Sequence, residues 1–228
     1  MIPSTLLRLI WLASPALPVG GFSYSEGLES AVEAGLVHDE PSAADWLANQ
    51  LELVLARAEG PLLAEAWQAW NEGDGAAAAA LNAWVGASRE SAEMRQQAEQ
   101  MGRSMVEWLK NGEHTHDARI AALAALRPAP TWPLAFALAA ALGGADARQT
   151  ILAFGFGWCE NMAQAAMKAV PLGQAAAQRM LARLAAALPG AVDDALARAA
   201  AGRRQAFAPM LAILSCHHET QYSRLFRS

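Results

Sequence analysis

The feature that most constrains the fold is a helical repeat of apolar residues that runs along nearly the whole chain. It is clearest between about 88 and 109, where Met94, Ala98, Met101, Met105 and Trp108 recur every three or four residues. The opposite face pairs opposite charges four residues apart, at Arg89/Glu93, Arg95/Glu99, Glu99/Arg103 and Arg103/Glu107. The repeat predicts an amphipathic helix whose methionines pack in the core rather than bind a metal.

Glycine and proline residues divide the rest of the chain into further helices. We place a helix start at Ser42, and Gly60-Pro61 ends that helix and begins another. Pro189-Gly190 separates two later helices, and no stretch shows the alternation of a strand. The sequence therefore predicts an all-α, single-domain bundle of about ten helices across residues 1–228. The remaining helices are expected at 62–70, after 75, and at 118–126, 132–142, 146–169, 173–188, 191–201 and 207–222.

One segment, residues 14–27, does not fit the helical pattern. It holds two prolines and three glycines, so we expect an ordered loop, and loops rich in such residues are often functional. The apolar run before it has its only cation, Arg8, inside the run, unlike a signal peptide. Apolar stretches such as 134–142 are too short to span a membrane. We expect no membrane association.

Charge and cysteine content narrow the function classes. The formal net charge of -5 gives no general attraction to nucleic acid, so we expect no nucleic-acid partner. Cys159 and Cys216 lack the spacing of a zinc site and are too few for a disulfide framework. A reducing cytoplasm fits best.

The common catalytic motifs are missing from the sequence. There is no phosphate-binding Gly-x-x-x-x-Gly-Lys-Ser/Thr run, so the chain alone should not hydrolyse GTP or ATP. The run 21–25 resembles the start of a serine-hydrolase elbow, but it lacks the closing glycine and a preceding strand. The sequence therefore supports neither of these two enzyme classes.

Two groups of residues are weak candidates for metal binding. His114 and His116 lie in a predicted turn without the i,i+4 spacing of a helical pair, and a solvated polar turn explains them better than a metal site. Cys216, His217 and His218 are suitable ligands for nickel, copper or zinc. Consecutive residues of one helix point in different directions, however, so at most a transient metal contact is expected.

The end of the sequence, residues 218–228, is dense in side-chain chemistry on an otherwise alanine-rich chain. Such a terminus favours a docking element over a solvated tail. Lys168 lies near the end of a predicted apolar helix, and two interpretations of its role stay open. It is either a cation that complements the helix dipole or a buried or interfacial functional lysine, in an apolar setting shared with Glu160.

Three separated segments resemble the UreF family of urease accessory proteins. They are LASPALPVGGFSYSEGLE at 12–29, KAVPLGQ at 168–174 and HETQYSRLFRS at 218–228. Two positions depart from the family pattern, because Glu26 stands where members often have Gln and His217 where Arg is common. The resemblance is weakest between about 60 and 142.

The resemblance implies an all-α, dimeric, non-catalytic protein with no tightly bound cofactor. Members of the family join UreD (also called UreH) and the GTPase UreG in a complex that activates apo-urease. GTP hydrolysis by UreG is coupled to nickel delivery, with UreE as nickel carrier. The chain would then be the adaptor between UreD and UreG, with nickel handled only transiently by the complex. It would either regulate GTP turnover or gate nickel passage.

The same resemblance assigns candidate sites. The tail and the 14–27 loop are the expected UreD-facing surface, with buried aromatic anchors and arginines for bidentate pairing. Lys168, Glu160 and Gln174 are the expected path for the GTPase or the nickel ion. Two alternatives stay open, a helical dimeric adaptor unrelated to urease and a nickel-binding carrier. The residues expected to bind partners are Tyr24, Ser25, Glu26, His218, Glu219, Tyr222, Arg224, Phe226 and Arg227.

Overall fold

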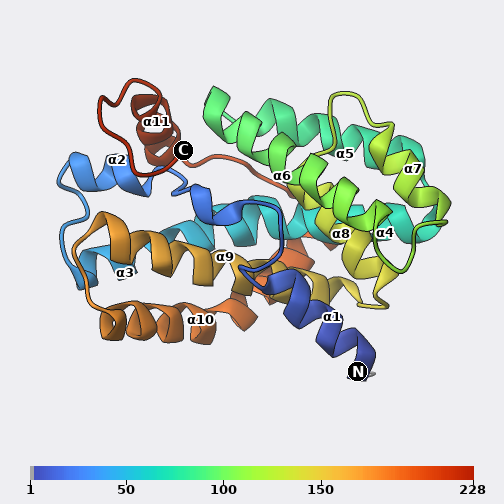
Figure 1. Cartoon of the computed structure of the whole chain (residues 1–228), viewed down its shortest axis with the longest axis horizontal. Helices are drawn as coiled ribbons and strands as arrows, with labels where there is room; N and C mark the ends of the chain where they lie inside the picture. Colours follow the sequence, from blue (N-terminus) through green and yellow to red (C-terminus); the bar gives the residue numbers. More distant parts are fainter. Residues whose placement is uncertain (1–2) are drawn as a thin grey trace.

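The structure, a computed structural model, describes residues 3–228, and these form the predicted all-helical bundle (Figure 1). In that part of the chain, no helix is both long enough and apolar enough to cross a membrane. The α-helices are α1 (Pro3–Ala13), α2 (Leu28–Glu33), α3 (Glu40–Gln50), α4 (Gly60–Glu72), α5 (Gly75–Ser88), α6 (Ala92–Lys110), α7 (Ala118–Ala124), α8 (Trp132–Leu142), α9 (Ala147–Ala169), α10 (Gln174–Ala200) and α11 (Pro209–His218). A 3-10 turn, η1 (Gly21–Ser23), and a π-helix, η2 (Leu51–Glu59), complete them.

Helix α9 is central to the bundle. It packs along α10 on one side and against α1 and α4 on others, while α8 lies against α4 and α6 (Figure 1). An aromatic cluster joins α8 and α9, since the rings of Phe136 and Phe154 meet edge to face at 5.2 Å. The last helix, α11, lies apart from this body and contacts α2 and the start of α6. The core thus leaves the C-terminal segment on one edge.

The first predicted helix boundaries were wrong. Asp39, not Ser42, caps α3: its carboxylate accepts a hydrogen bond from the Ser42 amide at 2.9 Å. Gly60-Pro61 does not end a helix either. Helix α3 continues without a gap through η2 into α4. Pro61 stands in the first turn of α4 and has no amide to donate, and the backbone oxygen of Arg57, four residues before it, accepts the amide of Gln205 instead at 2.8 Å. A Cβ at Gly60 would lie 2.5 Å from that of Ala195, so the glycine allows α10 to approach.

Pro189-Gly190 was also wrongly predicted to separate two helices. Helix α10 runs through both residues for 27 residues. Leu188, Val192 and Ala195 are buried on either side of the proline, and we attribute the continuity to this packing, which offsets one lost backbone hydrogen bond. Helices α1 and α2 were not predicted, and α11 ends at His218, four residues earlier than expected.

The charges of α6 are used differently from the prediction. Of the four i,i+4 pairs, Glu99 and Arg103 form an ion pair, at 3.1 Å. Arg89 instead reaches Glu59 of η2 at 2.6 Å, and Glu93 turns to the C-terminal segment. The methionine stripe is buried as predicted. The start of α6 and the residues just before it therefore pair with two separate polar clusters, at η2 and at the tail.

Candidate functional site

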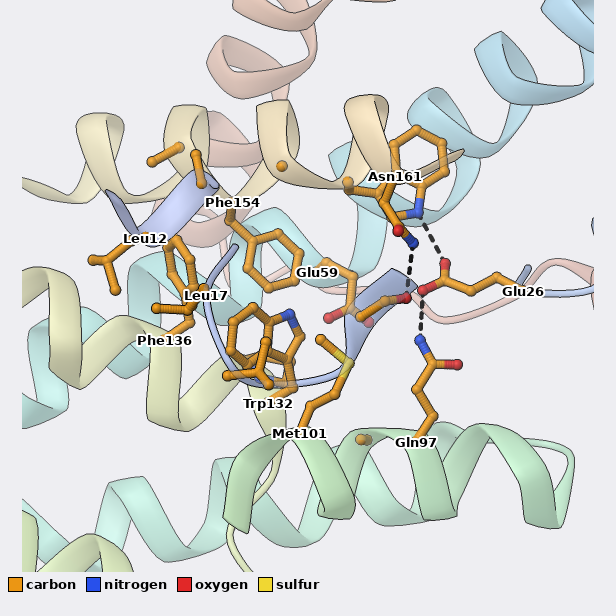
Figure 2. A pocket seen from close by; sticks show the side chains of 18 of the residues that line it. Leu12, Leu17, Glu26, Glu59, Gln97, Met101, Trp132, Phe136, Phe154 and Asn161 are labelled. Atoms are coloured by element: carbon orange, nitrogen blue, oxygen red, sulfur yellow. Dashed lines mark hydrogen bonds between the residues drawn. The ribbon is translucent and has the colours of Figure 1, made fainter. Parts of the chain in front are cut away.

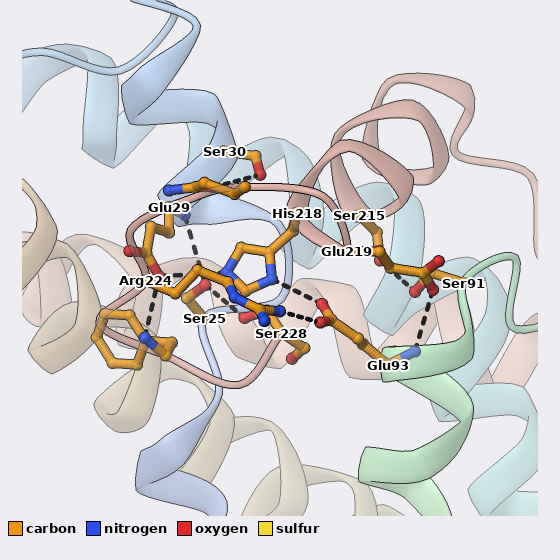
Figure 3. Close-up of polar contacts among 12 residues, drawn as sticks. Ser25, Glu29, Ser30, Ser91, Glu93, Ser215, His218, Glu219, Arg224 and Ser228 are labelled. Carbon is orange, nitrogen blue, oxygen red and sulfur yellow. Dashed lines mark hydrogen bonds and ion pairs between the residues drawn. The ribbon is translucent and has the colours of Figure 1, made fainter.

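The C-terminal tail is held by a buried carboxylate on α2. Glu29 is 7% exposed, and it accepts hydrogen bonds from the backbone amides of Leu225 at 2.7 Å and Phe226 at 3.0 Å. Its second oxygen also lies 3.2 Å from Nε2 of His218 (Figure 3). One side chain thus satisfies backbone donors of the tail that would otherwise be buried without partners.

His218 lies between two carboxylates. Its side chain is fully buried, with Nδ1 2.6 Å from Glu93 and Nε2 facing Glu29. A neutral imidazole has only one N–H, so the ring donates to both carboxylates only as an imidazolium. Arg224 pairs with the other oxygen of Glu93 at 2.6 Å. His218 and Arg224 of the C-terminal segment therefore face the carboxylates of Glu29 and Glu93, and this cluster ties the tail to α2 and α6.

The 14–27 loop binds the end of the tail. The amide and hydroxyl of Ser25 both donate to the backbone oxygen of Ser228, at 2.8 and 2.6 Å. The amide of Arg227 donates to the backbone oxygen of Ser23 at 2.8 Å. Lys168 at the end of α9 places its Nζ 5.9 Å from the centre of the Phe226 ring. All three segments singled out from the sequence therefore meet on one surface.

Two of the three expected aromatic anchors are buried within the chain, and the third, Tyr222, is exposed. Tyr24 and Phe226 are only 3% and 7% exposed within the chain itself, so neither is free to enter a partner while the tail is in place. Burial raises the pKa of the Tyr24 hydroxyl. Arg224 already pairs with Glu93, whereas Tyr222, Leu225 and Phe22 are exposed. These three side chains are exposed large apolar or aromatic groups of the loop and the tail.

The candidate metal ligands lie in two places, near the start of α6 and beyond its end, and Glu219 lies with the first group. The Glu219 carboxylate accepts the amide of Ala92 at 2.5 Å and so caps the start of α6. His218 points inward, while Cys216 and His217 of the same helix are exposed. His114 and His116 lie beyond the other end of α6, where His114 contacts Arg8 at 2.5 Å. Within residues 3–228, no three His, Cys, Asp or Glu side chains are placed to hold a metal ion.

The three residues expected on a GTPase or nickel path do not form one cluster. Lys168 is exposed at the last turn of α9, and Gln174 is exposed at the first residue of α10. Glu160 is half-buried two turns before Lys168, and among the described residues no ion pair joins them. Lys168 and Gln174 thus flank the turn between α9 and α10, whereas Glu160 lies closer to the middle of the bundle.

A cavity of about 130 Å³ lies on the other side of the 14–27 loop (Figure 2). Glu26 lies at one end of it, in a left-handed backbone conformation with φ of 50°, which is rare for a residue other than glycine. Its carboxylate accepts hydrogen bonds from Gln97 Nε2 at 2.7 Å and Trp158 Nε1 at 2.8 Å. Burial nevertheless raises the pKa of Glu26.

Glu59 supplies a second carboxylate to the cavity, and sequence reasoning missed it. It is 6% exposed and ends the π-helix η2, a kind of helix that is frequent at functional sites. One oxygen forms an ion pair with Arg89 at 2.6 Å, and neither oxygen has a partner in hydrogen-bond geometry. Figure 2 shows the carboxylate among the rings of Phe154 and Trp132. The available signal was an acid among the apolar and small residues of 58–64.

Together these features define an all-helical protein whose distinctive residues build a surface and a cavity lined by aromatic rings and two carboxylates. Comparison with known proteins identifies the family. The sequence model of the UreF family matches residues 37–185. A urease accessory protein UreF from Methylibium petroleiphilum (strain ATCC BAA-1232 / LMG 22953 / PM1) is 60% identical over 225 residues, which cover 99% of this chain and 94% of that protein. The UreF of Paracidovorax citrulli (strain AAC00-1) is 59% identical, covering 99% of this chain and 90% of its own length.

The chain belongs to the UreF family of urease accessory proteins. A longer relative is also similar. The bifunctional urease accessory protein UreEF of Bordetella bronchiseptica is 52% identical over 98% of this chain, which spans 52% of that protein. The family resemblance seen in the three sequence segments is therefore confirmed.

Proposed function

We propose that this chain is the adaptor of a urease-maturation complex that inserts nickel into apo-urease. In this role it joins UreD (UreH) to the GTPase UreG in the cytoplasm and has no catalytic activity of its own. Nickel is cargo of the complex rather than a resident cofactor. The accessory names of the relatives support the urease assignment. The resemblance of the three segments supports the named partners.

The observation that carries the proposal is the meeting of the three signature segments on one surface. The tail is hydrogen-bonded to the 14–27 loop, and Lys168 lies beside Phe226 of the tail, although the three segments are far apart in sequence. Around them, Phe22 is 61% exposed, Leu225 69% and Tyr222 fully. Exposed apolar and aromatic side chains rimmed by arginines are typical of a protein–protein interface. We assign this surface to UreD.

Co-purification with UreD and UreG tests the assignment. Exposed aromatic anchors often contribute about 2 kcal/mol or more to binding, so the double variant Tyr222→Ala/Leu225→Ala should lose at least about tenfold in affinity for UreD. Gln178→Ala, an exposed change on α10, is the matched control and should bind normally. Full retention of UreD by the double variant would refute this surface. Capture of neither partner by the unaltered chain would refute the adaptor function.

Lys168, Glu160 and Gln174 are assigned to the GTPase side of the proposal. Lys168→Ala should alter GTP turnover by UreG or urease activation while changing the free energy of unfolding by less than about 1 kcal/mol, because the residue is exposed. A change in stability alone would mean that Lys168 only complements the dipole at the end of α9.

We also propose a homodimer. Light scattering should give twice the chain mass of 24.1 kDa, and the single mass would exclude it.

A further inference from the structure

The cavity beside the 14–27 loop has more acceptors than its own residues satisfy. Two carboxylates, Glu26 and Glu59, and one cation, Arg89, are the ionisable side chains that line it. Glu26 receives two hydrogen bonds, but the second oxygen of Glu59 receives none, although the side chain is only 8% exposed. A buried acceptor without a partner costs about 1–3 kcal/mol, and more when it is charged. The cavity therefore lacks a donor.

The rest of the lining matches a flat, positively charged group. Trp132 and Phe154 face each other across 6.0 Å between ring centres, and Phe136 completes the aromatic wall. Aromatic faces attract cations that have left water, by about 2 kcal/mol. Phe22 and Pro15 line the cavity and are also exposed, so it reaches the surface at the loop. This combination of acids and aromatic rings favours a cation over an anion.

We propose that this cavity binds a small organic monocation with several N–H donors, of the guanidinium or primary ammonium class, between Glu59 and Glu26. The ligand donates to the free oxygen of Glu59 and balances the one excess carboxylate. Neither the UreF family assignment nor the adaptor function requires this site. Two backbone features also mark it: the π-helix that ends at Glu59 and the left-handed conformation of Glu26.

Proton linkage follows from the same charges. Glu59 acts on Glu26 as a like charge and Arg89 as an opposite one, and burial favours the protonated acid. A bound cation stabilises the carboxylate, so binding at low pH releases the Glu26 proton to solvent. Affinity should therefore rise with pH through the titration of Glu26 and level off above it.

Guanidinium chloride with urea as a neutral isostere gives a direct test. Guanidinium has four heavy atoms, and roughly −1 kcal/mol of binding free energy per atom corresponds to a Kd of about 1 mM. This concentration is far below those that denature proteins. The indole N–H signals of ¹⁵N-tryptophan protein report on Trp132 and Trp158, which line the cavity. Guanidinium should shift both signals saturably, whereas urea and sodium chloride at equal concentration should not. Equal shifts from urea, or no shift from guanidinium, would overturn the proposal.

Two variants locate the effect. Glu59→Gln should weaken guanidinium binding at least tenfold, which corresponds to about 1.4 kcal/mol. It also leaves Arg89 without its buried partner and can impair folding, so Glu26→Gln serves as a second variant. Glu26→Gln should weaken binding and abolish its pH dependence. Unchanged affinity in Glu26→Gln, or micromolar nickel binding with the same indole shifts, would refute an organic-cation site.

Discussion

Glu29 should control whether the tail stays attached. Its carboxylate accepts two backbone amides, those of Leu225 and Phe226, and faces the buried His218 ring. Replacement by glutamine keeps the shape but removes the charge, and it turns an NH₂ group toward donors. A hydrogen bond to a charged acceptor contributes about 1.5–3 kcal/mol, and these bonds share one side chain and do not add fully. We expect tail release to become easier by about 3 kcal/mol.

Amide hydrogen exchange measures this release directly. Since 1.4 kcal/mol is a factor of ten, the amides of Leu225 and Phe226 should exchange roughly a hundredfold faster in Glu29→Gln. Glu33→Gln, the same change one turn later on α2 at an exposed position, is the control and should leave these amides unchanged. Amides in the centre of α9 should stay protected in both variants. Tail exchange within threefold of the unaltered protein would show that Glu29 does not hold the tail.

Three further predictions concern close packing, Glu26 and the thiols. Gly102→Ala would place a Cβ 2.1 Å from the Pro130 oxygen, so it should lower the free energy of unfolding by about 1–3 kcal/mol. Gly86→Ala, whose Cβ would have nothing within 4 Å, should raise the free energy of unfolding by about 0.5–1 kcal/mol. Unfolding of both variants in urea measures the difference. The pKa of Glu26 is raised above its ordinary 4.5, so its contribution to stability is complete below 4.5 and is lost as pH rises through the folded value. The stability of the unaltered protein relative to Glu26→Gln should fall over that window, and a constant difference would contradict the burial of an ionisable carboxyl. Exposed Cys216 should react quickly with a disulfide reagent. Burial raises the pKa of Cys159 to about 12, so this thiol should react only after the protein unfolds. Fast reaction of both thiols in the folded protein would contradict this.

The sequence predicted most helices because their signals are local. The caps at Ser91 and Asp146 and the periodic faces of α6 and α9 depend on residues a few positions apart. The errors at Gly60-Pro61 and Pro189-Gly190 share one cause, since in both places a helix continues because it packs against another helix. Local preference favours a break there, and tertiary contacts outweigh it.

The candidate site was predicted only in part for a similar reason. The 14–27 loop and the tail stood out by composition, but nothing local shows that Glu29 binds the tail from 196 residues away. Glu93 illustrates the point. Its spacing predicts a pair with Arg89, yet it pairs with His218 and Arg224, while Arg89 pairs with Glu59. Side chains of long reach choose partners in space, and a single sequence does not give that arrangement.

Gln97 gives the two clusters a thermodynamic connection. Its Nε2 donates to Glu26 at the cavity, and its Oε1 accepts the hydroxyl of Ser228 at the end of the tail. Anything that binds the cavity more tightly when the tail is in place must, to the same factor, make the tail harder to remove. A partner that lifts the tail would in turn lower the affinity of the cavity for its occupant. Through the amide of Gln97, ligand binding in the cavity and release of the tail would each change the equilibrium constant of the other.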